Sequence, residues 1–160
     1  MLKFFSSSAT NKVDAKGRVS IPAPFRKVLQ GEGSSVLVLV PEITGRPIIE
    51  GFGEAHFNKL AASLEEMNPY TPEYDALANM VFGEAHQLPL DDTGRIVLPQ
   101  EFRDLTGITD LAHFVGRANT FQIWNPETYN AGRAEMRETA KANVDKLPWA
   151  GKRGADRGAP

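Results

Sequence analysis

The chain has 160 residues and a mass of 17.5 kDa, the size of one ordinary domain or of two small units that share a core. Hydrophobic residues make up 41% and charged residues 24% of it, which excludes collagen-like, coiled-coil and wholly disordered structures. It has no cysteine, so disulfides, thiolate metal sites and thiol catalysis are excluded, and no apolar run is long enough to span a bilayer. We therefore expect a cytoplasmic protein without a membrane partner.

The charge is distributed unevenly, although the formal net charge is only −2. Residues 1–30 carry six basic side chains and one acidic side chain, a net charge of +5. Residues 31–90 carry two basic and nine acidic side chains, a net charge of −7, and residues 91–160 carry ten of each. Such segregation gives a nearly neutral molecule a positive face that can steer a polyanion. Solvated surfaces without a partner would also explain it.

The first predicted elements are a turn, a strand and a helix. Residues 14–17 have the composition of a tight turn, because an aspartate side chain accepts hydrogen bonds from nearby amides and glycine tolerates positive φ. Alternating apolar residues predict a short strand at residues 19–21. Pro22 then ends the strand and opens a helix. The side chains expected to turn inward from that helix are Phe25, Val28 and Leu29.

A hairpin and two helices are predicted next. Residues 36–40 indicate a buried strand, and residues 47–50 indicate its hairpin partner. Residues 54–67 carry apolar side chains at helical spacing, and residues 71–85 open with a Thr-Pro-Glu start signal. We therefore expect two helices in the middle of the chain.

The second half of the chain repeats the first at a constant offset of 77 residues. Residues 14–26 lie over residues 91–103, and six of the 13 aligned positions are identical: Asp14 and Asp91, Gly17 and Gly94, Arg18 and Arg95, Pro22 and Pro99, Phe25 and Phe102, Arg26 and Arg103. The repeat predicts a second turn at residues 91–94 and strands at residues 96–98, 112–115 and 120–124. It also predicts a helix with Phe102 and Leu105 facing inward and Gly107 as its stop. A unit of about 45 residues exposes too much strand edge to stand alone, so the two copies must pack on each other.

The C-terminal part is predicted to contain a helix and a tail. A helix from residue 125 to about residue 142 has only a thin apolar stripe, and the residues from Pro148 on read as a disordered, mildly basic end. The predicted organisation is therefore a first repeat at 8–55, connecting helices at 56–84, a second repeat at 85–130, a C-terminal helix at 131–147 and a tail at 148–160.

The paired motif resembles a known family. Two Asp-x-x-Gly-Arg turns, each followed by an apolar strand, a proline and Phe-Arg, and separated by two helices, are similar to the MraZ family over roughly residues 8–132. That family is the duplicated, single-chain member of the SpoVT-AbrB swapped-hairpin group of bacterial transcription regulators. The resemblance implies an α+β fold in which two SpoVT-AbrB-like swapped-hairpin repeats form a pseudo-twofold β-barrel core with flanking helices.

The resemblance also implies a function. It implies ring-like homo-oligomers that associate with the nucleoid and bind double-stranded DNA sequence-specifically. The expected targets are repeated promoter elements upstream of the division and cell-wall gene cluster. In this chain the second turn has Asp92-Thr93 where the first has Ala15-Lys16, so we do not expect both turns to contribute equally.

The residues expected to contact DNA lie at the two turns. Arg18 and Arg95 each follow a glycine turn, from which a guanidinium can project and form two parallel hydrogen bonds with guanine O6 and N7. Contacts to the DNA backbone are expected from Lys12, Lys16 and Asn11. The residues expected to shape the loops are Asp14, Gly17, Asp91 and Gly94. A simple Asp-Arg clamp within each turn is the alternative role for both arginines, and Arg26 and Arg103 are expected to be structural.

Other function classes find little support in the sequence. The adjacent Glu65 and Glu66 point in different directions on a helix, and neither His56 nor His86 has a second histidine three or four residues away. We therefore expect no enzyme, cofactor, metal or small-molecule substrate. An antitoxin role is disfavoured because the tail after residue 148 is short and poor in apolar residues. The remaining alternative is a protein-interaction module without direct DNA readout, in which the acidic residues 31–90 contact a basic partner.

Overall fold

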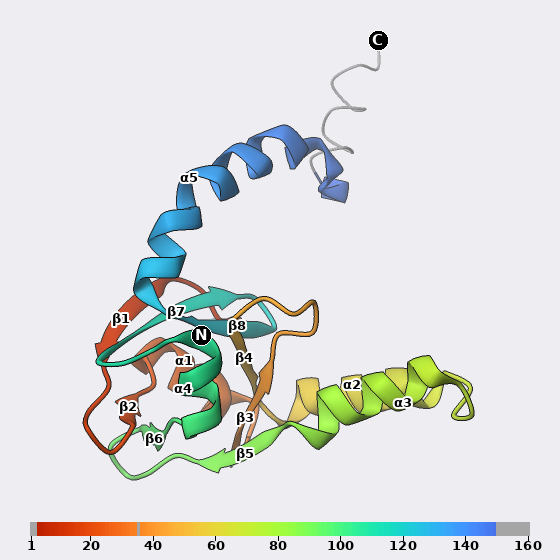
Figure 1. The fold of residues 1–160 in the computed structure, drawn as a ribbon, viewed down its shortest axis with the longest axis horizontal. Coiled ribbons are helices and arrows are strands. Elements are labelled where there is room, and N and C mark those ends of the chain that lie inside the picture. Colours follow the sequence, from red (N-terminus) through yellow and green to blue (C-terminus); the bar gives the residue numbers. More distant parts are fainter. Residues whose placement is uncertain (1–2, 35, 150–160) are drawn as a thin grey trace. The chain divides into compact units, whose positions relative to one another are not determined.

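The computed structural model describes residues 3–34 and 36–149 of the chain. These residues form an α+β fold with eight strands and five α-helices, and every pair of neighbouring strands among them is antiparallel (Figure 1). In this described part, no helix combines the length and the apolar character that crossing a membrane requires. The chain divides into one unit up to residue 126 and a second unit from residue 127 on.

The first repeat contains the strands and the helix that the sequence predicts, and one further strand at residues 8–12 that it does not. Its elements are β1 (Ser8–Lys12), β2 (Arg18–Ser20), α1 (Ala23–Gly31), β3 (Val36–Pro41) and β4 (Ile49–Phe52). Helix α1 begins after Pro22, and Pro24 occupies its first turn, where a missing backbone N–H costs no hydrogen bond. Phe25, Val28 and Leu29 are buried, as predicted.

Two helices connect the repeats. They are α2 (Glu54–Glu65) and α3 (Pro72–Ala78), and a π-helical turn (Asn79–Gly83) continues α3. The Thr71 hydroxyl caps α3 by accepting a hydrogen bond from the Tyr74 amide at 3.2 Å. The two helices lie side by side (Figure 1). Apolar side chains from both line a small pocket.

The second repeat contains the equivalent elements. They are β5 (His86–Pro89), β6 (Arg95–Val97), α4 (Gln100–Thr106), β7 (Leu111–Arg117) and β8 (Thr120–Trp124). Gly107 ends α4 with a left-handed φ of 73°, as predicted, and Phe102 is buried. The prediction for Leu105 was wrong, because this side chain is 42% exposed. Thr106 takes the inward position of the last turn instead, and its hydroxyl donates to the Phe102 carbonyl at 2.8 Å.

Strands of the two repeats are interleaved in the sheet. The six-stranded sheet has the order β1-β7-β8-β4-β3-β5, and β2 and β6 form a separate two-stranded ribbon. The first strand of each repeat pairs with the other repeat, since β1 pairs with β7 and β5 pairs with β3. Exchanging the equivalent strands of the two repeats gives the same order read from the other end of the sheet. The repeats therefore share one core, in which Phe5, Phe25, Phe114 and Phe121 contact one another.

The sheet is not closed, so the expected β-barrel is not what the structure shows. Strands β1 and β5 end the six-stranded sheet, and they are not paired with each other in the described residues. The β2–β6 ribbon is only three residues long, and in the described residues the backbone bridging between it and the β1 side is one isolated bridge, Val13 with Val19. Such short strands provide too few ladder hydrogen bonds to complete a barrel.

The second unit begins with a long helix. Helix α5 (Pro126–Asn143) confirms the helix predicted from residue 125 to about residue 142, and a 3₁₀ turn (Val144–Lys146) follows. None of its residues is buried, in agreement with its thin apolar stripe. From residue 150 on, the predicted tail lies outside the described residues.

Candidate nucleic-acid interface

Strands β2 and β6 form a short ribbon (Figure 1), and its register brings the two predicted arginines to one surface. In its register Arg18 lies opposite Val97, Val19 opposite Ile96, and Ser20 opposite Arg95. Opposite residues of an antiparallel pair share a face and successive residues alternate, so Arg18 and Arg95 lie on the same face. The exposure of the side chains agrees with this assignment of faces. Val19 and Ile96, on the inner face, are 1% and 3% exposed, whereas Val97, on the arginine face, is 55% exposed. Along the ribbon the two arginines are two residues apart, about 7 Å. We call this surface, made of Arg18, Ser20, Arg95 and Val97, the ribbon face.

One carboxylate organises the first turn. Asp14 Oδ1 accepts hydrogen bonds from the backbone amides of Lys16 and Arg18, each at 2.9 Å. Its Oδ2 accepts from Arg18 Nε at 2.6 Å. The Gly17 amide donates to the Asp14 carbonyl at 2.9 Å, and Gly17 has a φ of 84°, which an L side chain rarely adopts. The same aspartate therefore fixes both the backbone and the arginine.

The second turn has the same geometry. Asp91 Oδ1 accepts from the backbone amides of Thr93 and Arg95, each at 2.9 Å, and its Oδ2 accepts from Arg95 Nε at 3.0 Å. The Thr93 hydroxyl adds a hydrogen bond of 2.7 Å to Oδ1 that the first turn does not have. Gly94 has a φ of 79°. The structure thus confirms both tight turns predicted from the repeat.

Hydrogen bonds keep both aspartates ionised. The Arg95 amide, followed by the Thr93 hydroxyl, holds the pKa of Asp91 well below its usual range. The Arg18 amide has the largest effect in lowering the pKa of Asp14. These hydrogen bonds to the anionic form are fully present above the ordinary carboxyl pKa and are lost only as the pH falls through the depressed pKa. The turns are therefore intact at neutral pH.

The Asp-Arg clamp is present in both turns, but it uses little of each guanidinium. An arginine has five N–H donors, and the clamp engages the one on Nε. Within the described residues, the structure shows no hydrogen bond from the Nη groups of Arg18 or Arg95. Both side chains are 41% exposed. A clamped arginine can therefore still present its Nη groups to a ligand.

The other predicted contact residues lie beside the first turn. Lys12 and Lys16 are exposed, at the end of β1 and within the turn. Asn11 is placed differently, because its Nδ2 donates to the Ser20 carbonyl at 2.7 Å and so ties β1 to β2. One of the two N–H donors of its amide is thus engaged within the protein.

The equivalent turns differ in charge. Residues 12–18 contain three basic side chains and one acidic side chain, a net charge of +2. Residues 89–95, the same positions in the second repeat, contain one basic and two acidic side chains, a net charge of −1. The first turn is thus the better electrostatic partner for phosphate.

Two residues that the sequence marked only as structural contact the turns. Arg26 Nη1 donates to the Thr93 carbonyl at 3.0 Å, and the Arg103 guanidinium lies against Gly17. Each arginine belongs to one repeat and contacts the turn of the other. Their identity in the repeat was the only sequence signal, because contact between repeats depends on the tertiary fold.

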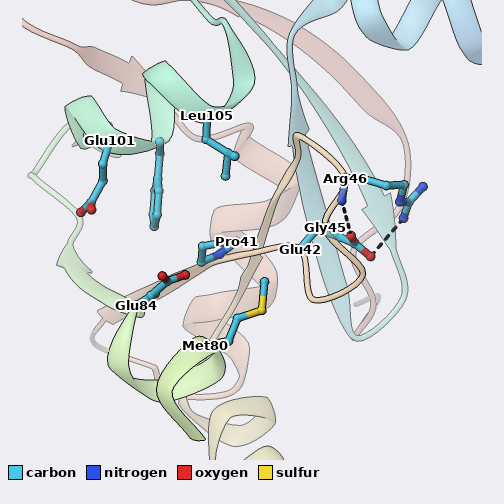
Figure 2. A pocket seen from close by; sticks show the side chains of 9 residues that line it. Pro41, Glu42, Gly45, Arg46, Met80, Glu84, Glu101 and Leu105 are labelled. Atoms are coloured by element: carbon cyan, nitrogen blue, oxygen red, sulfur yellow. Dashed lines mark hydrogen bonds and ion pairs between the residues drawn. The ribbon is translucent and has the colours of Figure 1, made fainter. Parts of the chain in front are cut away.

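A cavity away from the ribbon face has an apolar and acidic lining, in contrast to the basic first turn. It has a volume of about 280 Å³ and lies between the β3–β4 loop, the π-helical turn and α4 (Figure 2). Pro41, Met80 and Leu105 give it an apolar lining, and Glu84 and Glu101 add negative charge. Its buried Glu42 is occupied by hydrogen bonds from Thr44 and Arg46. Phosphate would be repelled here, and the described residues include no group of three acids or histidines placed to hold a metal ion.

Comparison with known proteins identifies the family. The family model described as "MraZ protein, putative antitoxin-like" matches residues 4–79 and 81–147. A protein of Parvibaculum lavamentivorans named "Transcriptional regulator MraZ" is 39% identical over 134 residues, which cover 84% of this chain and 83% of that protein. A protein of the same name from Rickettsia bellii is 38% identical over 86% of this chain and 91% of its own length. Another, from Gluconobacter oxydans, is 38% identical over 91% of this chain and 88% of its own length. The chain therefore belongs to the MraZ family.

Proposed function

We propose that this protein is a transcriptional regulator that binds double-stranded DNA with the ribbon face and its two turns. The observation that carries the proposal is that two clamped arginines lie on one face of a two-stranded ribbon. The names of its relatives, which call them transcriptional regulators, support the role in transcription.

The ribbon face suits the major groove of DNA. That groove is about 12 Å wide and admits a two-stranded β-ribbon. Each guanidinium has Nη donors for guanine O6 and N7, and its Nε is already held by an aspartate. Because the clamp restricts a long side chain before binding, less conformational entropy is lost when the base contact forms. Base readout is therefore assigned to Arg18 and Arg95.

Backbone contacts are assigned to the first turn. Lys12 and Lys16 are exposed next to Arg18, where they can contact phosphates on either side of the groove. Asn11 is a weaker candidate, because one of the two N–H donors of its amide is held by the Ser20 carbonyl, which restricts how the side chain can turn toward DNA. Asp14, Gly17, Asp91 and Gly94 shape the loops and do not contact DNA themselves.

One ribbon supplies few contacts, so several must act together. A ring of subunits that presents the ribbon face repeatedly to spaced DNA repeats would raise avidity by roughly 10² to 10⁴. The proposal therefore includes a ring-like homo-oligomer, nucleoid association, and repeated promoter elements of the division and cell-wall gene cluster as targets. It also includes the swapped-hairpin architecture, which the exchange of strands between the repeats supports.

Selection from a random DNA pool tests this proposal. The purified full chain is mixed with random duplexes, and bound fragments are sequenced after several rounds at physiological salt. The expected result is a short motif in tandem copies, with affinity that falls steeply as salt rises. Recovery of unrelated sequences, or an affinity that does not respond to salt, would overturn it.

A protein-interaction module without direct DNA readout is the second candidate. The apolar cavity that carries Glu84 and Glu101 favours it, because that surface suits a basic segment with an apolar side chain (Figure 2). Capture of partners from a lysate with and without nuclease separates the two. Partners recruited through DNA disappear after nuclease treatment, whereas direct protein partners remain.

A further inference from the structure

Arg26 of the first repeat covers the inner side of the second turn. Its Nη1 donates to the Thr93 carbonyl at 3.0 Å, and its side chain packs so closely on Gly94 that an added Cβ there would overlap Nη1 and Cδ. Gly94 is buried although residues 91–93 are exposed. The arginine therefore supports this turn from behind, on the side away from solvent.

Arg103 of the second repeat has the equivalent place behind the first turn. A Cβ added to Gly17 would lie 3.1 Å from Cζ and from Nη2 of Arg103. Gly17 is buried although residues 14–16 are exposed. The contact is thus present twice, once in each direction between the repeats.

Backbone hydrogen bonds cross between the repeats at the same two points. The Ile21 amide donates to the Gly94 carbonyl at 3.0 Å, and the Leu98 amide donates to the Gly17 carbonyl at 2.8 Å. Each turn is therefore attached to the opposite repeat by its glycine carbonyl. The arginine behind it fills the space that this attachment leaves next to the glycine.

Both arginines are placed there at a cost. The Nε atoms of Arg26 and Arg103 are buried without a hydrogen-bond partner in the described residues. A buried donor without a partner is unfavourable, and an apolar side chain of similar length would fill the space without it. What arginine adds is a cation with several N–H donors, which can donate to carbonyl groups of the turn as Arg26 does to Thr93.

We propose that Arg26 and Arg103 are positioning residues, each of which sets the geometry of the DNA-reading turn in the other repeat. Arg103 holds the turn that carries Arg18, and Arg26 holds the turn that carries Arg95. The inference rests on the proposed function for its effect on DNA. The crossed support itself is a property of the protein alone and can be measured without DNA.

Backbone amide NMR of the free protein tests the crossed support. Arg103→Ala should shift the amide resonances of Gly17 and Arg18 and leave those of Gly94 and Arg95 in place, and Arg26→Ala should do the reverse. The matched control is Lys27→Ala, which removes an exposed cation from the same helix as Arg26. Equal changes in both turns, or changes only in the turn of the same repeat, would overturn the proposal.

Conservative variants keep this test valid if an alanine variant does not fold. Arg103→Met and Arg26→Met retain most of the apolar contact but remove the planar cation. The same crossed pattern is expected from them. If both methionine variants leave all four amide resonances unchanged, packing alone suffices and the proposal is wrong.

Double substitutions test the consequence for DNA. Once Arg18→Ala has been introduced, adding Arg103→Ala should change affinity less than about twofold, because the residue it positions is gone. Added to Arg95→Ala, the same change should weaken binding about tenfold. Equal effects on both backgrounds would refute the positioning role. If the parent protein binds no DNA, the proposed function fails, while the NMR result still decides whether the crossed support exists.

Discussion

The turn at residues 14–18 and the turn at residues 91–95 share three hydrogen bonds to the aspartate side chain, and they have opposite net charge. The aspartate, glycine and arginine that build them are identical, and each carboxylate accepts from two amides and from its own arginine. The two intervening positions are Ala15-Lys16 in one and Asp92-Thr93 in the other, and all four residues are exposed. Geometry is therefore carried by the buried and hydrogen-bonded positions, while charge can differ at positions that the fold does not constrain.

This comparison predicts unequal roles in DNA binding. In the first turn, phosphate attraction from Lys12 and Lys16 adds to whatever base contact Arg18 makes. In the second turn, Arg95 must act against the charge of the exposed Asp92.

Arg18→Ala should have the largest effect. It removes a base-reading guanidinium. It also leaves the Asp14 carboxylate without its cation, and an unpaired carboxylate repels phosphate. A weakening of at least about 10²-fold on tandem sites is expected, because the loss recurs in every subunit. Gel-shift titration measures it, and light scattering should show an unchanged oligomer. Undiminished affinity at physiological salt would remove Arg18 from the site.

Arg95→Ala should have a smaller effect. The same contact is lost from a turn with weaker attraction for phosphate, so a weakening of about tenfold is expected in the same titration. The matched pair separates geometry from charge, since both substitutions remove an arginine with the same clamp and exposure. A loss equal to that of Arg18→Ala would mean that turn charge is irrelevant.

Charge changes at the intervening positions should act in opposite directions. Lys16→Ala should weaken binding and reduce the salt slope by about one, whereas Asp92→Ala should strengthen binding a few-fold. The side chains of both residues are exposed, so neither change should disturb its turn. Affinity measured across a salt series checks both. Weaker binding by Asp92→Ala would contradict the account.

Lowering the pH should have the smallest effect on the two turns, and it should open them at different pH values. Both aspartates have lowered pKa values, so their turns should not change between pH 8 and pH 5. Below the ordinary carboxyl pKa of about 3.9, the first turn should open before the second, because Asp91 has the additional Thr93 hydroxyl. The amide resonances of Arg18 and Arg95 report this. A transition of either near pH 6 would be inconsistent with ionised, hydrogen-bonded aspartates.

The sequence predicted the turns, helices and most strands well, because the motif at residues 14–26 recurs at residues 91–103 and each copy supports the interpretation of the other. The turns depend on Asp14, Gly17 and their equivalents, whose chemistry is local. Strands β1 and β5 were missed, since Ser8–Lys12 is polar without alternation and His86–Pro89 is short. Their pairing is set by β7 and β3, which lie far away in the chain.

Only the part of the candidate site that depends on local sequence could be predicted. Arg18 and Arg95 could be selected from the motif, but their common face depends on the register between β2 and β6. The contacts of Arg26 and Arg103 with the opposite turns, and the open sheet, likewise depend on how the repeats pair. Pairing between distant segments is tertiary information that a local pattern does not contain.

Photo-crosslinking from the ribbon face tests the central claim most directly. The chain has no cysteine, so Ser20→Cys, opposite Arg95 on the ribbon face, and Ser63→Cys, on α2, each provide one attachment point for a photoactivatable label. Both serines are exposed. Irradiation with a selected tandem duplex should crosslink DNA to the label at position 20 and leave position 63 unreacted. Equal labelling, or crosslinking only from position 63, would contradict the assignment of DNA binding to the ribbon face.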